Sequence, residues 1–255
     1  MPITINDLKH FKAQHHPGDD TSQVGGAVTA SEITGSVLGE VVPSGSMFVG
    51  NAQQVYHYKT FVKNTHASDA ALAVKLWVDN GLRNMDTAGR IEIVSDNTGD
   101  GSPTVARVIG VSGGSVYVEE ITLSGTTPVA TAAAYSALYR VELRRAGAPQ
   151  AAAGTIQVRR MGGPVLGIIP PGASMATAEV DVGLAPAAND NATSPNRRTA
   201  PSGVTYSRAT NEATALAIGD MSAGTAWGVW RRYTFAANVP KADRFEVHFR
   251  IQALV

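Results

Sequence analysis

Apolar and polar residues alternate with a period of two in several short segments of the chain. Residues 244–252 read RFEVHFRIQ, where Phe245, Val247, Phe249 and Ile251 are separated by charged or polar residues. Successive side chains of a strand point to opposite sides of the sheet, so this alternation is typical of a strand that buries one face. The pattern therefore predicts a half-buried strand near the end of the chain.

The same alternation recurs at residues 72–78 and 139–144. Elsewhere the apolar runs are short and end at Gly, Pro, Asn or Asp roughly every ten residues, which is the spacing of many short strands. Further strands are predicted at residues 55–63, 90–94, 104–109, 115–123, 155–160, 176–184 and 226–235. The chain is thus expected to be all-β, with very little helix.

The alternation changes parity inside residues 115–123. Val116 and Val118 share one face of the predicted strand, whereas Ile121 falls on the other. One extra residue inserted into the strand would return the later apolar side chains to the face of Val116 and Val118. A β-bulge is therefore expected near Glu119 and Glu120.

Two polar stretches interrupt the pattern. Residues 1–36 contain almost no alternation and are expected to form an extended N-terminal arm, which either stays disordered or is ordered by a neighbouring subunit. Residues 185–203 are expected to form a long exposed loop between strands.

Composition and charge narrow the function classes. The chain has 255 residues and no cysteine, which excludes disulfides, thiolate metal sites and a cysteine nucleophile. Lys plus Arg and Asp plus Glu both number 21, so no global field attracts nucleic acid or an anionic membrane. We expect neither a nucleic-acid partner nor membrane insertion, since no segment has the length of a membrane span.

Two stretches resemble a family of tailed-phage virion structural proteins. Residues 56–80, YHYKTFVKNTHASDAALAVKLWVDN, resemble a strand, an Asn-Thr-His turn and a second strand of that family. Residues 199–249 resemble its C-terminal part, from TAPSGVTY through GDMSAG to VWRR and DRF. The family's N-terminal region often carries a Gly-Gly-Ala motif, and Gly25, Gly26 and Ala27 stand in that place. The resemblance covers less than half of the chain.

The resemblance implies a domain order as well as a function. Residues 83–170 depart from the shorter family members, and their VYVEEITLSGTTPV stretch resembles a β unit of phage and viral structural proteins. We therefore expect a β-sandwich domain made of residues 37–82 plus 171–255, interrupted by a smaller inserted β domain at 83–170. The alternative is two tandem domains with a boundary near Thr126, which would place the two resembling stretches in separate cores.

Two motifs invite a metal. His15 and His16, with His10, Asp19 and Asp20 nearby, combine imidazole and carboxylate, but their spacing matches no known site and a partner-contacting arm is the favoured interpretation. The DNTGDG sequence at residues 96–101 is similar to a calcium loop, yet Thr98 and Arg107 stand where acidic ligands are needed. It is interpreted as a hairpin turn, and no metal ligand is assigned.

The sequence offers little for catalysis or cofactors. Glu119 and Glu120 are adjacent, so on a regular strand they face opposite sides and cannot act together on a substrate. GVSGGS at 110–115 and MGGP at 161–164 lack the strand-to-helix setting and the Lys-Ser or Lys-Thr pair of a phosphate loop. We expect no catalytic and no cofactor-binding residue, and hence a protein that is not an enzyme.

Arginine pairs and aromatic residues remain as candidates for contacts. The pairs at 144–145, 159–160, 197–198 and 231–232 are interpreted as interface ion pairs or solvated faces. Trp230 and Arg232 are the candidate residues for contact with a glycan or a partner protein, because their strand parity opposes that of Trp227. Most strand aromatics fill cores, which is the competing interpretation.

The resemblance therefore implies a structural component of a tailed-phage virion, assembled in the cytoplasm of the bacterial host. Its expected partners are other virion proteins and copies of itself, and its mechanism is assembly without chemistry. A peripheral tail, baseplate or tail-tip position is preferred. The alternatives are a capsid decoration protein and a module that binds host glycans.

Overall fold

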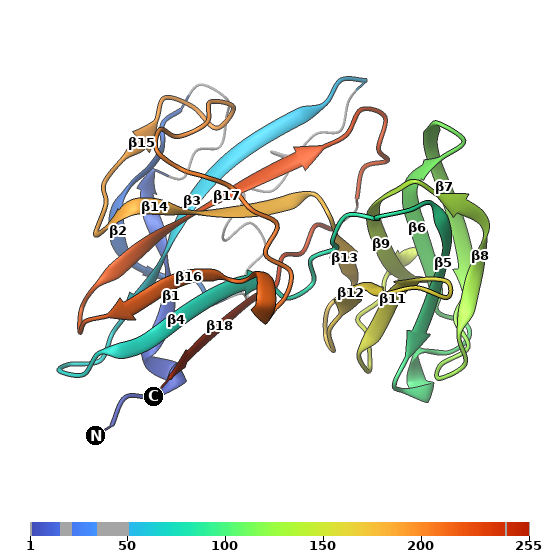
Figure 1. Cartoon of the computed structure of the whole chain (residues 1–255), viewed down its shortest axis with the longest axis horizontal. Helices are drawn as coiled ribbons and strands as arrows, with labels where there is room; N and C mark the ends of the chain where they lie inside the picture. Colours follow the sequence, from blue (N-terminus) through green and yellow to red (C-terminus); the bar gives the residue numbers. More distant parts are fainter. Residues whose placement is uncertain (1, 16–21, 35–50, 243, 255) are drawn as a thin grey trace. The chain divides into compact units, whose positions relative to one another are not determined.

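The chain is all-β, as the alternation predicts. The computed structural model describes residues 2–15, 22–34, 51–242 and 244–254, which form mostly antiparallel strands (Figure 1). The helices among these residues are the short 3₁₀ turns Ile5–Asp7 (η1), Thr98–Asp100 (η2) and Glu212–Thr214 (η3). In the described part of the chain, no helix has the length and apolarity that crossing a membrane requires.

The chain divides into two compact units, each built from discontinuous segments. The first unit comprises Met1–Trp77, Asp181–Ala236 and Arg250–Val255, and the second comprises Val78–Val180 and Ala237–Phe249. Residues 83–170, where the sequence predicts an inserted domain, lie within the second unit. That unit also takes in the later segment Ala237–Phe249, which the sequence assigns to the other domain.

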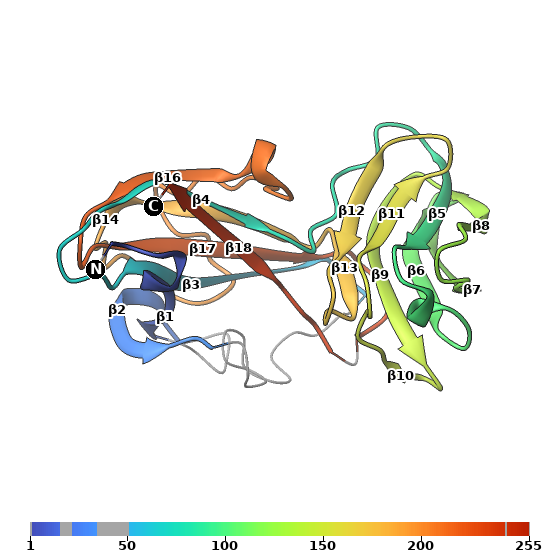
Figure 2. The ribbon, with the colours of Figure 1, turned by 90° about the horizontal axis from the view of Figure 1, so that it is seen from below.

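The described residues of the first unit form two sheets. Its larger sheet has the order β14-β17-β3-β1-β2-β15, and its smaller sheet has the order β16-β4-β18. Figure 2 shows β4 and β16 as a layer apart from β3 and β17. The strands are β1 (Leu8–His15), β2 (Val24–Glu32), β3 (Gln54–Asn64), β4 (Ala71–Val78), β14 (Val180–Ala188), β15 (Thr193–Ser194), β16 (Leu216–Met221), β17 (Ala226–Phe235) and β18 (Phe249–Leu254).

The expectation of an extended N-terminal arm at residues 1–36 is wrong for the part that the structure describes. β1 pairs with β3 from Leu8 opposite Asn64 to Lys12 opposite Thr60, and β2 pairs with β1. Register shifts interrupt the β1–β2 ladder. These irregularities, with Gly25 and Gly26 in β2, remove the alternation that identifies a strand in the sequence.

Two further expectations need correction. The strand predicted at 244–252 begins only at Phe249. The residue before it bonds to a side chain and not to a neighbouring strand, since the His248 amide donates to Asn80 Oδ1 at 2.9 Å. The loop predicted at 185–203 contains the end of β14 and all of β15, and Arg197 within it is buried.

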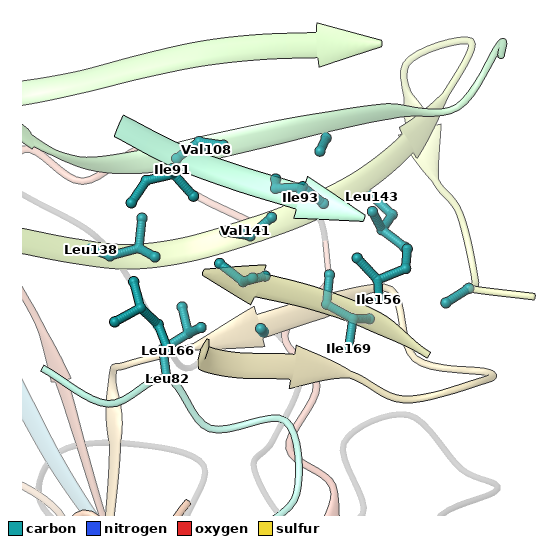
Figure 3. Packing of buried hydrophobic residues seen from close by; sticks show 14 of the residues in the cluster. Leu82, Ile91, Ile93, Val108, Leu138, Val141, Leu143, Ile156, Leu166 and Ile169 are labelled. Carbon is teal, nitrogen blue, oxygen red and sulfur yellow. The ribbon is translucent and has the colours of Figure 1, made fainter. Parts of the chain in front are cut away.

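The second unit is a β-sandwich. Its sheets have the orders β10-β9-β6-β7, with β13 added beside β9, and β12-β11-β5-β8. A shared apolar core includes Ile91, Val108, Val141 and Ile156 (Figure 3). The strands are β5 (Gly89–Ser95), β6 (Val105–Ser112), β7 (Ser115–Thr122), β8 (Val129–Tyr135), β9 (Ala137–Arg145), β10 (Ala148–Pro149), β11 (Ile156–Arg160), β12 (Val165–Ile169) and β13 (Met175–Thr177).

Two local expectations fail in the second unit. β7 pairs with β6 without a register shift from Val105 opposite Thr122 to Ser112 opposite Ser115, so there is no bulge near Glu119. The 96–101 segment is not a hairpin turn, because it joins β5 and β6, which belong to different sheets.

Candidate functional site

The β3–β17 ladder is the framework on which the candidate site lies. The two strands pair without interruption from Ala226 opposite Lys63 to Phe235 opposite Gln54. Directly opposed residues of an antiparallel pair share a face of the sheet. Lys59 and Trp230 therefore lie on one face of this ladder, and Tyr58 and Arg231 lie on the other.

The second of these faces is lined by buried aromatic rings. Tyr58 and Tyr233 meet edge to face with centroids 5.9 Å apart, and Arg197 Nη1 donates to the Tyr58 hydroxyl at 3.3 Å. Burial raises the pKa of Tyr233 to about 12, although the nearby Arg231 opposes the shift. The Tyr233 phenol is thus a neutral core residue at ordinary pH, in keeping with the strand pattern.

The same aromatic face holds a buried arginine and a histidine. Arg231 is 1% exposed and its guanidinium donates to the Thr60 hydroxyl. Burial lowers its pKa to about 10. Burial, with the charge of Arg231, also lowers the pKa of His10 to about 3. The interpretation of the Arg231–Arg232 pair as solvated or interfacial is therefore wrong for Arg231.

On the opposite face, Lys59 binds segments that are far apart in the sequence. Its Nζ donates to Asp190 Oδ2 at 2.7 Å, and to the carbonyl oxygens of Asp190, Gly26 and Ala192 at 3.0, 3.1 and 3.2 Å. Burial lowers the pKa of Lys59, and the Asp190 carboxylate opposes that shift. The ammonium group has acceptors for all its protons, as a buried charge requires. Lys59 thereby joins β3 to β2 and to the chain before β15.

Trp230 lies in the same buried region and explains the Gly-Gly pair. A Cβ atom on Gly25 would come within 2.9 Å of Trp230 Cη2 and 2.8 Å of the Ala192 carbonyl oxygen. Gly25 also has φ +96°, a conformation that L side chains disfavour. Only glycine fits here, so the motif serves packing against Trp230.

Trp230 is 0% exposed, which corrects its assignment to a glycan or partner contact. A ring that stacks on a sugar must present a face to solvent, whereas this ring packs against β2 and lies near the Lys59 ammonium. Strand parity does not predict the burial of Trp230, because the residues on both faces of β17 are buried at this position.

Arg232, the second predicted contact residue, does reach the surface. Its side chain is 38% exposed, and Nη2 lies 2.8 Å from Asp181 Oδ2. The other oxygen, Asp181 Oδ1, lies 3.1 Å from Nε of Arg208. Asp181 itself is buried, so two arginines converge on one recessed carboxylate.

Tyr206 and His57 complete this surface cluster. The Arg232 Cζ atom lies 4.9 Å from the centre of the Tyr206 ring, and the Tyr206 hydroxyl is 2.9 Å from His57 Nδ1. Burial, and then the charge of Arg232, lowers the pKa of His57 to about 4. Burial raises the pKa of Tyr206. The cluster of Asp181, Arg232, Arg208, Tyr206 and His57 is called the Arg232 cluster below.

The second unit holds its own buried charge network. Glu142 lies within 3.2 to 3.7 Å of guanidinium nitrogens of Arg107, Arg140 and Arg144, and Arg140 also reaches Glu179 at 3.4 Å. Glu142, Arg140 and Glu179 are all buried. Because three arginines surround the Glu142 carboxylate, we interpret it as part of a structural ion network rather than as a general base.

The carboxylates of the 96–101 segment are occupied by donors of the chain. Asp100 accepts from the Ser95 hydroxyl at 2.6 Å and from the amides of Ala153 and Gly154 at 2.7 and 3.0 Å. Asp96 accepts from the Thr155 amide at 2.8 Å. Both side chains fasten the segment to the chain around residue 154. Calcium would have to displace these donors.

Other candidates for chemistry are also separated by the fold. The Glu119 carboxylate accepts from the Ala132 and Ala133 amides at 2.5 and 3.1 Å, whereas Glu120 lies 3.8 Å from Arg107. Among the described residues, no three His, Asp or Glu side chains are grouped to hold a metal. His10 and His15 lie on β1, and the remaining members of that motif, His16, Asp19 and Asp20, lie outside the described residues.

Most residues of the Arg232 cluster carry no sequence signal. His57 and Asp181 are single polar residues inside strands, and Tyr206 and Arg208 flank a bridge between Val182 and Ser207 that the sequence does not reveal. The signal that the sequence offers for Arg232 is its strand parity, which opposes that of Trp227.

Comparison with known proteins gives no match, whether with family models, curated proteins or solved structures.

Proposed function

We propose that the chain is a structural subunit of a tailed-phage virion, which acts through contacts with other virion proteins and with copies of itself. The observation that carries this proposal is the pairing of the two resembling stretches. Most of β3 lies in the first stretch, residues 56–80, and β17 lies in the second, residues 199–249. These two strands form the longest continuous ladder described in the first unit. Motifs that are 150 residues or so apart in the sequence thus form one structural element, as expected if the resemblance extends to the fold.

The internal use of polar groups also supports a structural role. Lys59, Asp100, Glu119 and Glu142 each hold strands or loops of their own unit through hydrogen bonds or ion pairs. Buried polar networks of this kind rigidify a unit and specify its arrangement. Such networks keep a subunit in one conformation within an assembled particle.

Assembly needs surfaces that can meet other subunits. β16 and β18 are the outer strands of the smaller sheet in the first unit, and an edge strand presents backbone groups on one side. Large apolar side chains are exposed in both units: Leu72 and Leu254 in the first, and Tyr117 and Met161 in the second. Edge strands and exposed apolar side chains of this kind form contacts between subunits.

Within the particle, we assign the chain to the peripheral tail, the baseplate or the tail tip. Two linked β units suit such modular parts, in which repeated copies make individually weak contacts collectively strong. Capsid decoration is the competing position, and it uses the same assembly chemistry.

The proposal is tested on particles of the virus that encodes the chain. Gradient-purified particles are analysed by quantitative mass spectrometry, with unassembled lysate protein as the control. We expect the chain in intact particles at a copy number that is a multiple of a ring or shell symmetry. Its presence in the lysate but not in purified particles would exclude the proposal.

A further inference from the structure

Arg232 presents a fixed cationic group at the surface of the first unit. Its Nε and Nη2 atoms lie 3.3 and 2.8 Å from Asp181 Oδ2, which holds the plane of the guanidinium group. Nη1 makes no hydrogen bond with the described residues. The Arg232 side chain as a whole is 38% exposed, compared with 23% for Arg208 and 8% for Asp181.

The neighbours of Arg232 preorganise it. The Tyr206 ring lies against one face of the guanidinium group, with Cζ 4.9 Å from the ring centre. The hydroxyl of Tyr206 is in turn fixed by His57, which is 3% exposed and is neutral at pH 7. A planar guanidinium group that is already oriented loses less entropy on binding than a mobile surface arginine.

The charge of Arg232 is only partly balanced by Asp181. That carboxylate is shared with Arg208, whose Nε lies 3.1 Å from Oδ1, so each arginine contacts one oxygen. Asp181 is also recessed, with 8% of its side chain exposed, whereas the two guanidinium groups are more accessible. Two arginine charges thus face one carboxylate charge, so these three side chains together carry positive charge.

We propose that the Arg232 cluster binds an oxyanion, namely a carboxylate of the kind found in acidic sugars or a phosphate. Arginine donors arranged in a plane match such groups in geometry and charge. Nη1 of Arg232 is the principal donor, with Arg208 beside it on the same carboxylate. This site is independent of the proposed place in a virion, because it rests on the geometry of one cluster.

The probes are sodium phosphate, glucuronate and, as the neutral control, glucose. Each is titrated into the full chain while NMR signals of the His57 ring and the Arg232 side chain are followed. We expect saturable shifts with phosphate, with glucuronate or with both, and none with glucose. Phosphate alone indicates a free inorganic anion, and glucuronate alone indicates an acidic sugar. Either result supports the site.

Variants assign the binding to the cluster. Arg232→Gln should weaken binding by about tenfold or more, since it removes the charged donor. Arg198→Gln, at an exposed arginine of the same unit, is the matched control and should leave binding unchanged. Asp181→Asn should strengthen binding severalfold, because it removes the competing negative charge while keeping the shape of the side chain.

Arg232→Gln and Asp181→Asn are expected to change the binding affinity in opposite directions, which distinguishes a specific effect from misfolding. A variant that merely loosens the unit weakens binding, so tighter binding by Asp181→Asn cannot arise from misfolding. The proposal is overturned by the absence of saturable binding to phosphate and glucuronate in the wild type. Binding that survives Arg232→Gln unchanged overturns it equally, as does a response to glucose of the same size.

Discussion

Nζ of Lys59 lies 2.7 Å from Oδ2 of Asp190, although the lysine side chain is 0% exposed and the two residues are 131 positions apart in the sequence. This contact fastens β3 to the chain before β15. Asp190→Ala leaves the buried ammonium group without its counter-charge. We expect a loss of about 3 kcal/mol in the free energy of unfolding, because breaking a buried ion pair strands the remaining charge. Urea denaturation measures this loss.

The double variant Lys59→Met/Asp190→Ala provides the control. Methionine fills similar volume without charge, so the double variant should be less destabilised than the sum of the single changes by about 1 kcal/mol or more. Strict additivity of the two single changes would contradict a direct coupling between Lys59 and Asp190.

Gly25→Ala should destabilise the first unit through a steric clash. The added Cβ meets Trp230 and the Ala192 carbonyl oxygen at 2.9 and 2.8 Å, in addition to the strain of φ +96°. Gly224→Ala is the matched control, since its φ is +74° but nothing lies within 4 Å of the added Cβ. We expect Gly25→Ala to cost about 2 kcal/mol more than Gly224→Ala in thermal or chemical denaturation. Equal costs would show that Trp230 does not pack as described.

Acid should destabilise the protein through two histidines. The pKa of His10 falls from 6.5 to about 3 and that of His57 from 6.5 to about 4, mainly by burial. Below pH 6.5 the unfolded chain takes up protons that the folded chain does not, so stability is full above this pH and falls as the pH decreases toward 4 and then 3. Each histidine contributes at most about 1.4 kcal/mol per pH unit.

The variant His10→Gln/His57→Gln should lose stability less steeply between about pH 6 and pH 4 than the wild type does. Denaturation curves measured at several pH values give both slopes. Parallel profiles for the two proteins would mean that neither histidine is kept neutral by the fold.

Glu119 and Glu120 offer a test with adjacent residues. Glu119 accepts from the amides of Ala132 and Ala133 in the outer strand β8, whereas Glu120 is exposed. Glu119→Ala should therefore speed hydrogen exchange at those two amides by about tenfold, equivalent to about 1.4 kcal/mol of lost protection. Glu120→Ala should leave their exchange unchanged. Equal exchange in both variants would contradict the role of Glu119 in securing β8.

The strands that sequence alone predicts are those with a regular period. β17 spans its predicted range of 226–235, and the range predicted at 139–144 lies inside β9, because both strands alternate over most of their length and pack against a core. β1 and β2 were not predicted, since their ladder contains register shifts and a glycine pair. The strand predicted from Arg244 starts late, because the Asn80 side chain bonds to the backbone before Phe249: its Oδ1 accepts from the His248 amide and its Nδ2 donates to the Glu246 carbonyl oxygen. Such long-range side-chain bonds leave no local pattern.

The candidate site was predicted only in part. Parity correctly separated Trp230 from Trp227, but it could not show that β2 covers Trp230. Arg232 is singled out because its strand parity opposes that of Trp227, whereas Asp181 and Tyr206 approach it only through the tertiary fold. Lys59 was missed for the same reason, since its partners come from segments that the fold alone brings together.

We propose that the chain is a repeated structural subunit of a phage particle. Cryo-electron microscopy of intact particles tests this claim most directly. We expect density at symmetry-related positions of the tail, baseplate or tail tip into which the first unit fits, with the β3–β17 ladder and the side chain of Trp230 recognisable. A particle map in which every protein density is assigned to other chains would contradict it.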